Sequence, residues 1–129
     1  MIISHSQRFI FIANRKTAST AIGIALSSAC NKQDVITPLG EDENIRRQLG
    51  YPKPRNFIPW QKKLAHLSLL TQRRLTGLWI SEKLKEVGYY THITPKKILN
   101  YLQPAVWESY FRFCFVRNPW DLVISHYYW

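Results

Sequence analysis

Two short segments combine basic and hydroxyl side chains in a way that suits the binding of phosphate-like groups. The first, residues 14–20 (NRKTAST), follows an apolar run and precedes an Ala- and Ile-rich stretch. A helix that begins there would add free backbone N–H groups and about half a positive charge to the donors of the side chains. The two glycines of a Walker A loop are absent, so the segment predicts a different phosphate or phosphosulfate cradle. A basic turn before an ordinary helix is the alternative.

The second segment, residues 115–121 (FVRNPWD), also connects an apolar run to a predicted helix. Asn118 is expected to cap that helix, with Pro119 in its first position. Arg117 would then lie at the end of a strand, beside the free N–H groups of the helix. Ser125 is two turns along the same side of the helix as Asn118, so it can bind a phosphate together with Arg117. The alternative for Ser125 is a solvated helix residue.

The elements that must position these segments alternate between strands and helices. Strands are predicted at 9–13, 89–93 and 111–116, and helices at 18–29, 94–102, 105–110 and from 119 onward, the last with an apolar stripe that packs on a sheet. Leucines at helical spacing from Leu64 onward predict a further helix within a loop-rich middle region. This alternation predicts an α/β fold with a mainly parallel sheet, in which ligands bind beyond the carboxyl ends of the strands.

Together, KTAST after a buried strand and FVRNPWDLVISHYYW near the end of the chain resemble the PAPS-dependent sulfotransferases. The likeness is greatest to their carbohydrate and heparan-type branch and its bacterial relatives. It implies a P-loop-like three-layer fold and PAPS (3′-phosphoadenosine 5′-phosphosulfate) as the sulfuryl donor. It also implies that the 5′-phosphosulfate is held by Arg15, Lys16, Thr17, Ala18, Ser19 and Thr20, and the 3′-phosphate by Arg117 and Ser125.

The resemblance further implies a sulfotransferase that passes the sulfuryl group to a hydroxyl of a carbohydrate-type acceptor. Lys16 would neutralise charge on the bridging oxygen as the sulfuryl group departs. His92, before the helix predicted at 94–102, is the first candidate for the base that takes the acceptor proton, and His66 is the second. For either histidine the alternative is a structural side chain. No metal is expected, because the chain has no zinc-ligand spacing and PAPS chemistry needs none.

Composition limits the class of partner. The chain has 129 residues, enough for one domain, and 18 Lys and Arg against 8 Asp and Glu give a net charge of +10. This excess favours anionic partners such as nucleic acid, acidic glycans or phosphonucleotides, the class to which PAPS and its product PAP belong. Nucleic acid is not expected, because the basic residues are spread along the chain. No run of about 18 apolar residues predicts a membrane span, and Cys30 and Cys114 predict no disulfide, so we expect a cytoplasmic protein.

Two features of the C-terminal region leave other interpretations open. The final predicted helix has a start signal but no stop signal before Trp129, which predicts that the domain is incomplete here. Its aromatic residues would then be exposed and could cause self-association. The alternatives to an active enzyme are a truncated or degenerate relative that binds nucleotide weakly without catalysis, or a P-loop-like protein that binds phosphonucleotides.

Overall fold

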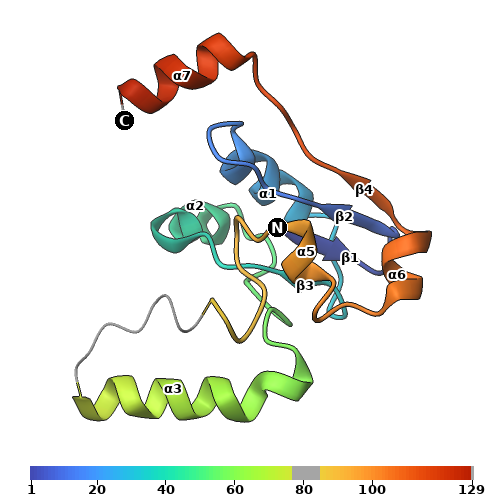
Figure 1. The fold of residues 1–129 in the computed structure, drawn as a ribbon, viewed down its shortest axis with the longest axis vertical. Helices are drawn as coiled ribbons and strands as arrows, with labels where there is room; N and C mark the ends of the chain where they lie inside the picture. The colour runs from blue at the N-terminus through green and yellow to red at the C-terminus, as the bar shows by residue number, and fades with distance from the viewer. Residues whose placement is uncertain (77–84, 129) are drawn as a thin grey trace.

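The computed structural model describes residues 1–76 and 85–128, and its centre is a four-stranded sheet (Figure 1). The strands β1 (Ile2–Ser4), β2 (Phe9–Phe11), β3 (Val35–Ile36) and β4 (Phe111–Phe113) lie in the order β3-β1-β2-β4. The described helices are α1 (Ser19–Ser27), α2 (Glu43–Gln48), α3 (Lys63–Thr76), α5 (Pro95–Ile98), α6 (Pro104–Ser109) and α7 (Pro119–Tyr127). Two short 3-10 helices, η1 (Gly40–Asp42) and η2 (Trp60–Lys62), precede α2 and α3.

The sheet is mixed, which corrects the prediction of a mainly parallel one. Strand β1 pairs antiparallel with both β2 and β3, and only β2 and β4 are parallel among the described strands. No strand was predicted at the positions of β1 and β3. Residues 5–8 connect β1 to β2, and so short a connection can join only antiparallel neighbours, whereas the long connection from β2 to β4 allows a parallel pair. The prediction of an α/β fold is confirmed at this coarser level.

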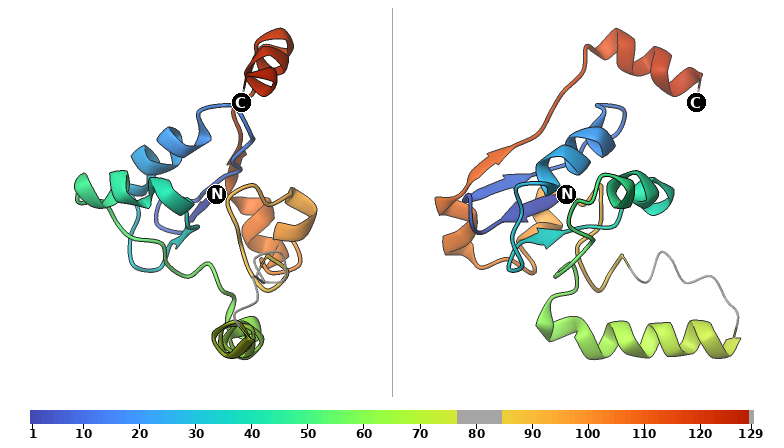
Figure 2. Two further views of the ribbon diagram at one scale, coloured as in Figure 1. Left: turned by 90° about the vertical axis from the view of Figure 1, so that its left-hand side faces the viewer. Right: turned by 180° about the vertical axis from the view of Figure 1, so that it is seen from behind.

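Each face of the sheet carries its own apolar core. Ile2, Phe11 and Ile36 point to the face covered by α1, where Ile22 and Leu26 pack against them. Their neighbours in the strands point to the opposite face, because successive side chains alternate across a sheet. There Ile3, Ile10 and Val35 form a core with Tyr89, Ile93, Ile98 and Leu102, next to α5 and α6. Figure 2 shows α1 and the α5–α6 region on opposite sides of the strands.

The predicted helices that lie within the described residues are present, some with different limits. The helix predicted at 18–29 is α1, the one at 105–110 is α6, and the leucine-rich helix is α3. The helix predicted at 94–102 is only α5, which begins at Pro95 as expected but ends at Ile98. Helix α7 begins as predicted, because the Asn118 side chain accepts from the Trp120 N–H at 3.0 Å.

The prediction of a strand at 89–93 is wrong, because these residues form turns and irregular backbone. Tyr89 and Ile93 are buried, as their apolar character requires. However, this segment packs on a face of the sheet rather than along its edge, and the Tyr89 N–H donates to the Phe57 carbonyl at 2.8 Å. At Gly88 a β-carbon would lie 2.6 Å from the same oxygen, so the two backbones approach more closely than any other residue allows.

Helix α7 does not pack on the sheet, which corrects the prediction made from its apolar stripe. The helix follows a long extended segment after β4 and lies apart from the body of the molecule (Figures 1 and 2). Trp120 is 78% exposed, and Tyr127 and Tyr128 are each 82% exposed. Helix α3 also lies to one side, with Leu64 83% exposed. No helix in the described part of the chain is both long and apolar enough to cross a membrane.

Candidate functional site

The two segments chosen from the sequence lie next to each other, at the carboxyl ends of the parallel strands β2 and β4. The Ile12 N–H donates to the Phe113 carbonyl at 2.9 Å and so extends the pairing beyond both strands. The amide of Asn14 then donates to the Phe115 carbonyl at 3.1 Å. Asn14, the first residue of the segment 14–20, therefore holds the two strand-to-helix junctions together.

The first junction is a tight loop with two residues in left-handed conformation. Lys16 has φ 61° and Ala18 has φ 55°, values that cost energy for any residue but glycine. The Thr17 hydroxyl donates to the Asn14 carbonyl at 3.1 Å and closes the turn. Helix α1 begins at Ser19, so the first N–H groups of the helix are directed toward this loop. Strain of this kind is typical of functional loops, and alternating backbone conformations form anion-binding concavities.

This loop forms one wall of a cavity of about 730 Å³. The cavity is lined by Arg15, Lys16, Ala18, Ser19, Thr20, Asp42, His92 and His126. Five of these residues come from the segment 14–20, and His92 comes from a region more than seventy positions later in the chain. We refer to this space as the cradle cavity. It brings together a lysine, an arginine, two hydroxyl groups, an aspartate and two histidines.

His92 is held in a defined orientation at the edge of the cradle cavity. Its Nδ1 lies 2.9 Å from the carbonyl oxygen of Ala13, two residues beyond β2. A carbonyl can only accept, so Nδ1 must carry a proton, and in the neutral imidazole Nε2 is then the basic nitrogen. The preceding residue is fixed as well: the Thr91 hydroxyl donates to the Pro38 carbonyl at 2.5 Å, and the Met1 amine donates to the Thr91 carbonyl at 3.3 Å.

Lys16, in the first junction, is affected by the charge of Arg117 in the second junction. Desolvation lowers the pKa of the Lys16 ammonium, and the positive charge of Arg117 lowers it further. The two cations are therefore close enough to repel each other. An anion bound between them would relieve this repulsion.

The structure brings together most of the predicted site residues, but not all of them. Arg117 is exposed and Ser125 is half-buried, and neither is among the described residues that line the cradle cavity. Thr17 also does not line it, because its hydroxyl is turned toward Asn14. His66 lines a separate cavity, about 220 Å³ in volume, together with residues such as Phe57 and Tyr89.

Two residues of the cradle cavity were not predicted. Asp42 ends the 3-10 helix η1 and adds a negative charge to the lining, and His126 reaches the cavity from α7. His126 follows Ser125 directly, but no motif in the sequence indicates that its side chain belongs to a site. Asp42 lies in the loop-rich region, where no periodicity indicates its orientation. Only the fold reveals both positions.

The described residues contain no group of three or more His, Cys, Asp or Glu side chains that could hold a metal ion. Compared with family models, with curated proteins and with solved structures, the chain matches none of them. Any conclusion about function therefore depends on the residues themselves and on their arrangement.

Proposed function

We propose that this chain is a PAPS-dependent sulfotransferase domain that transfers a sulfuryl group to a hydroxyl of a carbohydrate-type acceptor. The observation that carries the proposal is the presence of His92 in the same cavity as Lys16, Ser19 and Thr20. A phosphate cradle alone would suit many nucleotide-binding proteins. A cradle with an oriented base beside it suits a reaction in which an acceptor proton must be removed.

In the proposed reaction the acceptor hydroxyl oxygen attacks the sulfur of PAPS. A new O–S bond forms as the bond between sulfur and the bridging oxygen of the 5′-phosphosulfate breaks. The acceptor proton passes to Nε2 of His92, the nitrogen left unprotonated by the hydrogen bond of Nδ1 to Ala13. The departing PAP gains negative charge on the former bridging oxygen, and Lys16 neutralises it together with the N–H groups at the start of α1.

The proposal includes further features that follow from the sequence resemblance. The domain would be a P-loop-like three-layer fold, which agrees with apolar cores on both faces of the sheet. Arg117 and Ser125 would bind the 3′-phosphate, and the influence of Arg117 on Lys16 supports a position near the donor. A cytoplasmic location agrees with two unpaired cysteines, the buried Cys30 and the exposed Cys114.

Calorimetric titration with PAP tests the donor site. We expect saturable binding to the wild-type chain, weakened about tenfold or more in Lys16→Ala and in Arg117→Ala, because each change removes a charge-assisted contact. Lys63→Ala is the matched control, since Lys63 is exposed on α3 and does not line the cradle cavity. Absence of PAP binding to a folded wild-type chain would contradict the proposal.

Release of PAP from PAPS in the presence of sugar acceptors tests catalysis. We expect His92→Ala to reduce the transfer rate about 100-fold or more, as for other general bases, while PAP binding changes little. His66→Ala should leave the rate unchanged, because His66 lines a different cavity. Equal losses in the two variants would exclude His92 as the specific base.

A second candidate function is nucleotide binding without catalysis. The binding would be weak, and one observation favours this: Arg117 and Ser125, the residues expected to hold the 3′-phosphate, do not line the cradle cavity in the described part of the chain. The same two experiments separate the candidates. Binding of PAP without acceptor-dependent release of PAP from PAPS would support the second one.

A further inference from the structure

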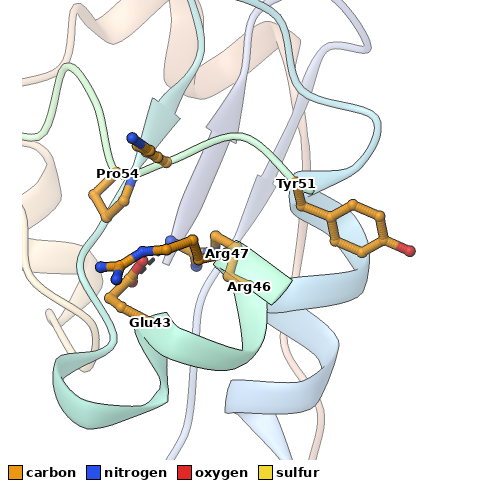
Figure 3. Close-up of a pocket in the computed structure, with 6 residues that line it drawn as sticks. Glu43, Arg46, Arg47, Tyr51 and Pro54 are labelled. Atoms are coloured by element: carbon orange, nitrogen blue, oxygen red, sulfur yellow. Dashed lines mark hydrogen bonds and ion pairs between the residues drawn. The ribbon is translucent and has the colours of Figure 1, made fainter. Parts of the chain in front are cut away.

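A further cavity, lined mainly by cationic side chains, lies beside α2. It is distinct from the cradle cavity and from the cavity lined by His66. It measures about 220 Å³ and is lined by Glu43, Arg46, Arg47, Tyr51, Lys53 and Pro54. We call it the Arg46 pocket. It has no lining residue in common with the cradle cavity among the described residues. In Figure 3 the side chains of Glu43 and Arg46 lie beneath Pro54, whereas the ring of Tyr51 points away from them.

The charges in this pocket are unbalanced. Three cationic side chains and one carboxylate line it, an excess of two positive charges. Glu43 is already engaged, because its Oε1 accepts from Nη1 of Arg46 at 2.9 Å and from the Leu39 N–H at 2.8 Å. Arg47 and Lys53 form no ion pair with the described residues. The pocket therefore has the electrostatic character of an anion-binding site.

Arg46 supplies an independent sign of a missing partner. The residue is only 1% exposed, which is rare for arginine. Its Nε is buried and has no hydrogen-bond partner among the described residues. A buried donor of a charged group that finds no partner is costly, and such atoms commonly mark the place of an unseen water or ion. The guanidinium group is planar, and two of its N–H donors side by side match the oxygens of a phosphate or sulfate.

We infer that the Arg46 pocket binds a doubly charged tetrahedral oxyanion, a phosphate group that is either free or carried by an ester. Arg46 contributes the charge of its guanidinium group, and Arg47 and Lys53 contribute charge from the exposed side of the pocket. The two positive charges in excess match a dianion better than a carboxylate. This site is separate from the donor cradle, and the inference does not depend on the proposed sulfuryl transfer.

The test is calorimetric titration of inorganic phosphate into the Lys16→Ala chain, at about pH 8, where phosphate is mainly a dianion. Lys16→Ala weakens the cradle, and further substitutions in the Arg46 pocket then measure the share of the remaining binding that belongs to this pocket. We expect this binding to fall about tenfold or more when Arg47→Ala and Lys53→Ala are added. Both side chains are exposed, so these substitutions should not prevent folding.

The matched control adds Lys62→Ala and Lys63→Ala instead, which removes the same charge from exposed side chains outside the pocket. We expect it to weaken phosphate binding less than about twofold. Equal losses in the two double variants would overturn the inference, because they would indicate general electrostatic attraction. Failure of the folded Lys16→Ala chain to bind phosphate at all would overturn it too.

A second measurement examines Arg46 itself and the source of the phosphate. Arg46→Lys keeps the charge but removes the planar guanidinium group, and we expect about tenfold weaker binding in the folded variant. If this variant does not fold, the variant with Arg47→Ala and Lys53→Ala still tests whether the Arg46 pocket binds phosphate. Glucose 6-phosphate, titrated in parallel, distinguishes an ester from the free ion: under the inference both occupy the pocket, and the tighter ligand identifies the source.

Discussion

The two strand-to-helix junctions of this protein have similar local sequences but different environments. Each has an apolar strand, a basic residue four positions beyond it and the start of a helix a few residues later. The first helix, α1, covers one face of the sheet, with Gly23 and Ile24 buried. The second helix, α7, has no buried residue and lies apart from the body. The neighbouring strands β2 and β4 are therefore followed by different helices. Helix α1 packs on the sheet, whereas the apolar face of α7 is not covered by other described residues.

This difference shows that a helix start and a packing position are separate properties. Asn118 caps α7 with a local hydrogen bond, which needs no tertiary contact. Helix α1 has no side-chain cap, and its preceding residue, Ala18, is in a left-handed conformation. Packing against Phe11 and its neighbours must compensate for that unfavourable start. The cradle loop is thus maintained by the core, whereas the second junction is maintained by its own residues.

The largest expected effect tests whether α1 depends on the core. Phe11 is 1% exposed, so Phe11→Ala should lower the free energy of unfolding by about 3–5 kcal/mol, through lost burial and a remaining cavity. Val123→Ala, on the exposed surface of α7, should change it by less than about 0.5 kcal/mol. Urea denaturation measures both. A similar loss in the two variants would break the comparison.

The next effect concerns Asp34, which follows α1 and precedes β3. Its buried carboxylate accepts hydrogen bonds from the Ser4 and Ser6 hydroxyls and from the N–H groups of His5, Ser6 and Asn31. Asp34→Asn should therefore cost about 2 kcal/mol of unfolding free energy, from the loss of charge-assisted bonds. Asp121→Asn, at an exposed position in the first turn of α7, is the control and should cost less than about 0.5 kcal/mol.

Asp34 also predicts a pH dependence. Burial alone would raise the pKa of its carboxyl group, but the hydrogen bonds from Asn31, Ser6 and His5 outweigh it and lower the pKa below 3.8. A carboxyl group with a lowered pKa in the folded state stabilises the protein above its unfolded-state pKa. The free energy of unfolding should fall as the pH decreases below about 4, through the folded-state pKa of Asp34. This decrease should be smaller in Asp34→Asn, and an unchanged pH profile would contradict the assignment.

A smaller effect separates local from tertiary stabilisation of α7. Asn118→Ala removes the cap, and we expect the helix to lose about 1 kcal/mol of local stability. Amide hydrogen exchange should increase in α7 while exchange in β2 and α1 stays the same. Faster exchange in α1 as well would show that the junctions are coupled through Asn14 and Phe115.

The smallest effect has the opposite sign and concerns the first junction. Ala18 has φ 55°, so Ala18→Gly should stabilise the fold by about 0.5–1 kcal/mol by removing backbone strain. Ala21→Gly, at an exposed position within α1, should destabilise it by a similar amount, about 0.5–1 kcal/mol. Thermal denaturation of the two glycine variants compares them directly. A loss of stability in both would mean that Ala18 is not strained.

The sequence alone determined the elements with strong local signals. Apolar runs identified β2 and β4, and Thr94-Pro95 and Asn118-Pro119 identified the starts of α5 and α7. The residues of the cradle were also apparent, because basic and hydroxyl side chains at a strand-to-helix junction have a clear chemical meaning. These features depend on neighbours in the chain, and so a local pattern can reveal them.

Only the tertiary structure decided the remaining features, because they depend on contacts between residues distant in sequence. Strand β3 has only two residues, too few for a recognisable pattern in the sequence. The apolar residues Tyr89 and Ile93 would give the same sequence pattern in a strand and in an irregular segment that packs on a sheet. Asp42 and His126 reach the cradle cavity through the fold, and His92 is oriented by the carbonyl of Ala13, 79 positions earlier in the chain. The apolar stripe of α7 specified a helix with one apolar face, but the surrounding residues determine whether that face is covered.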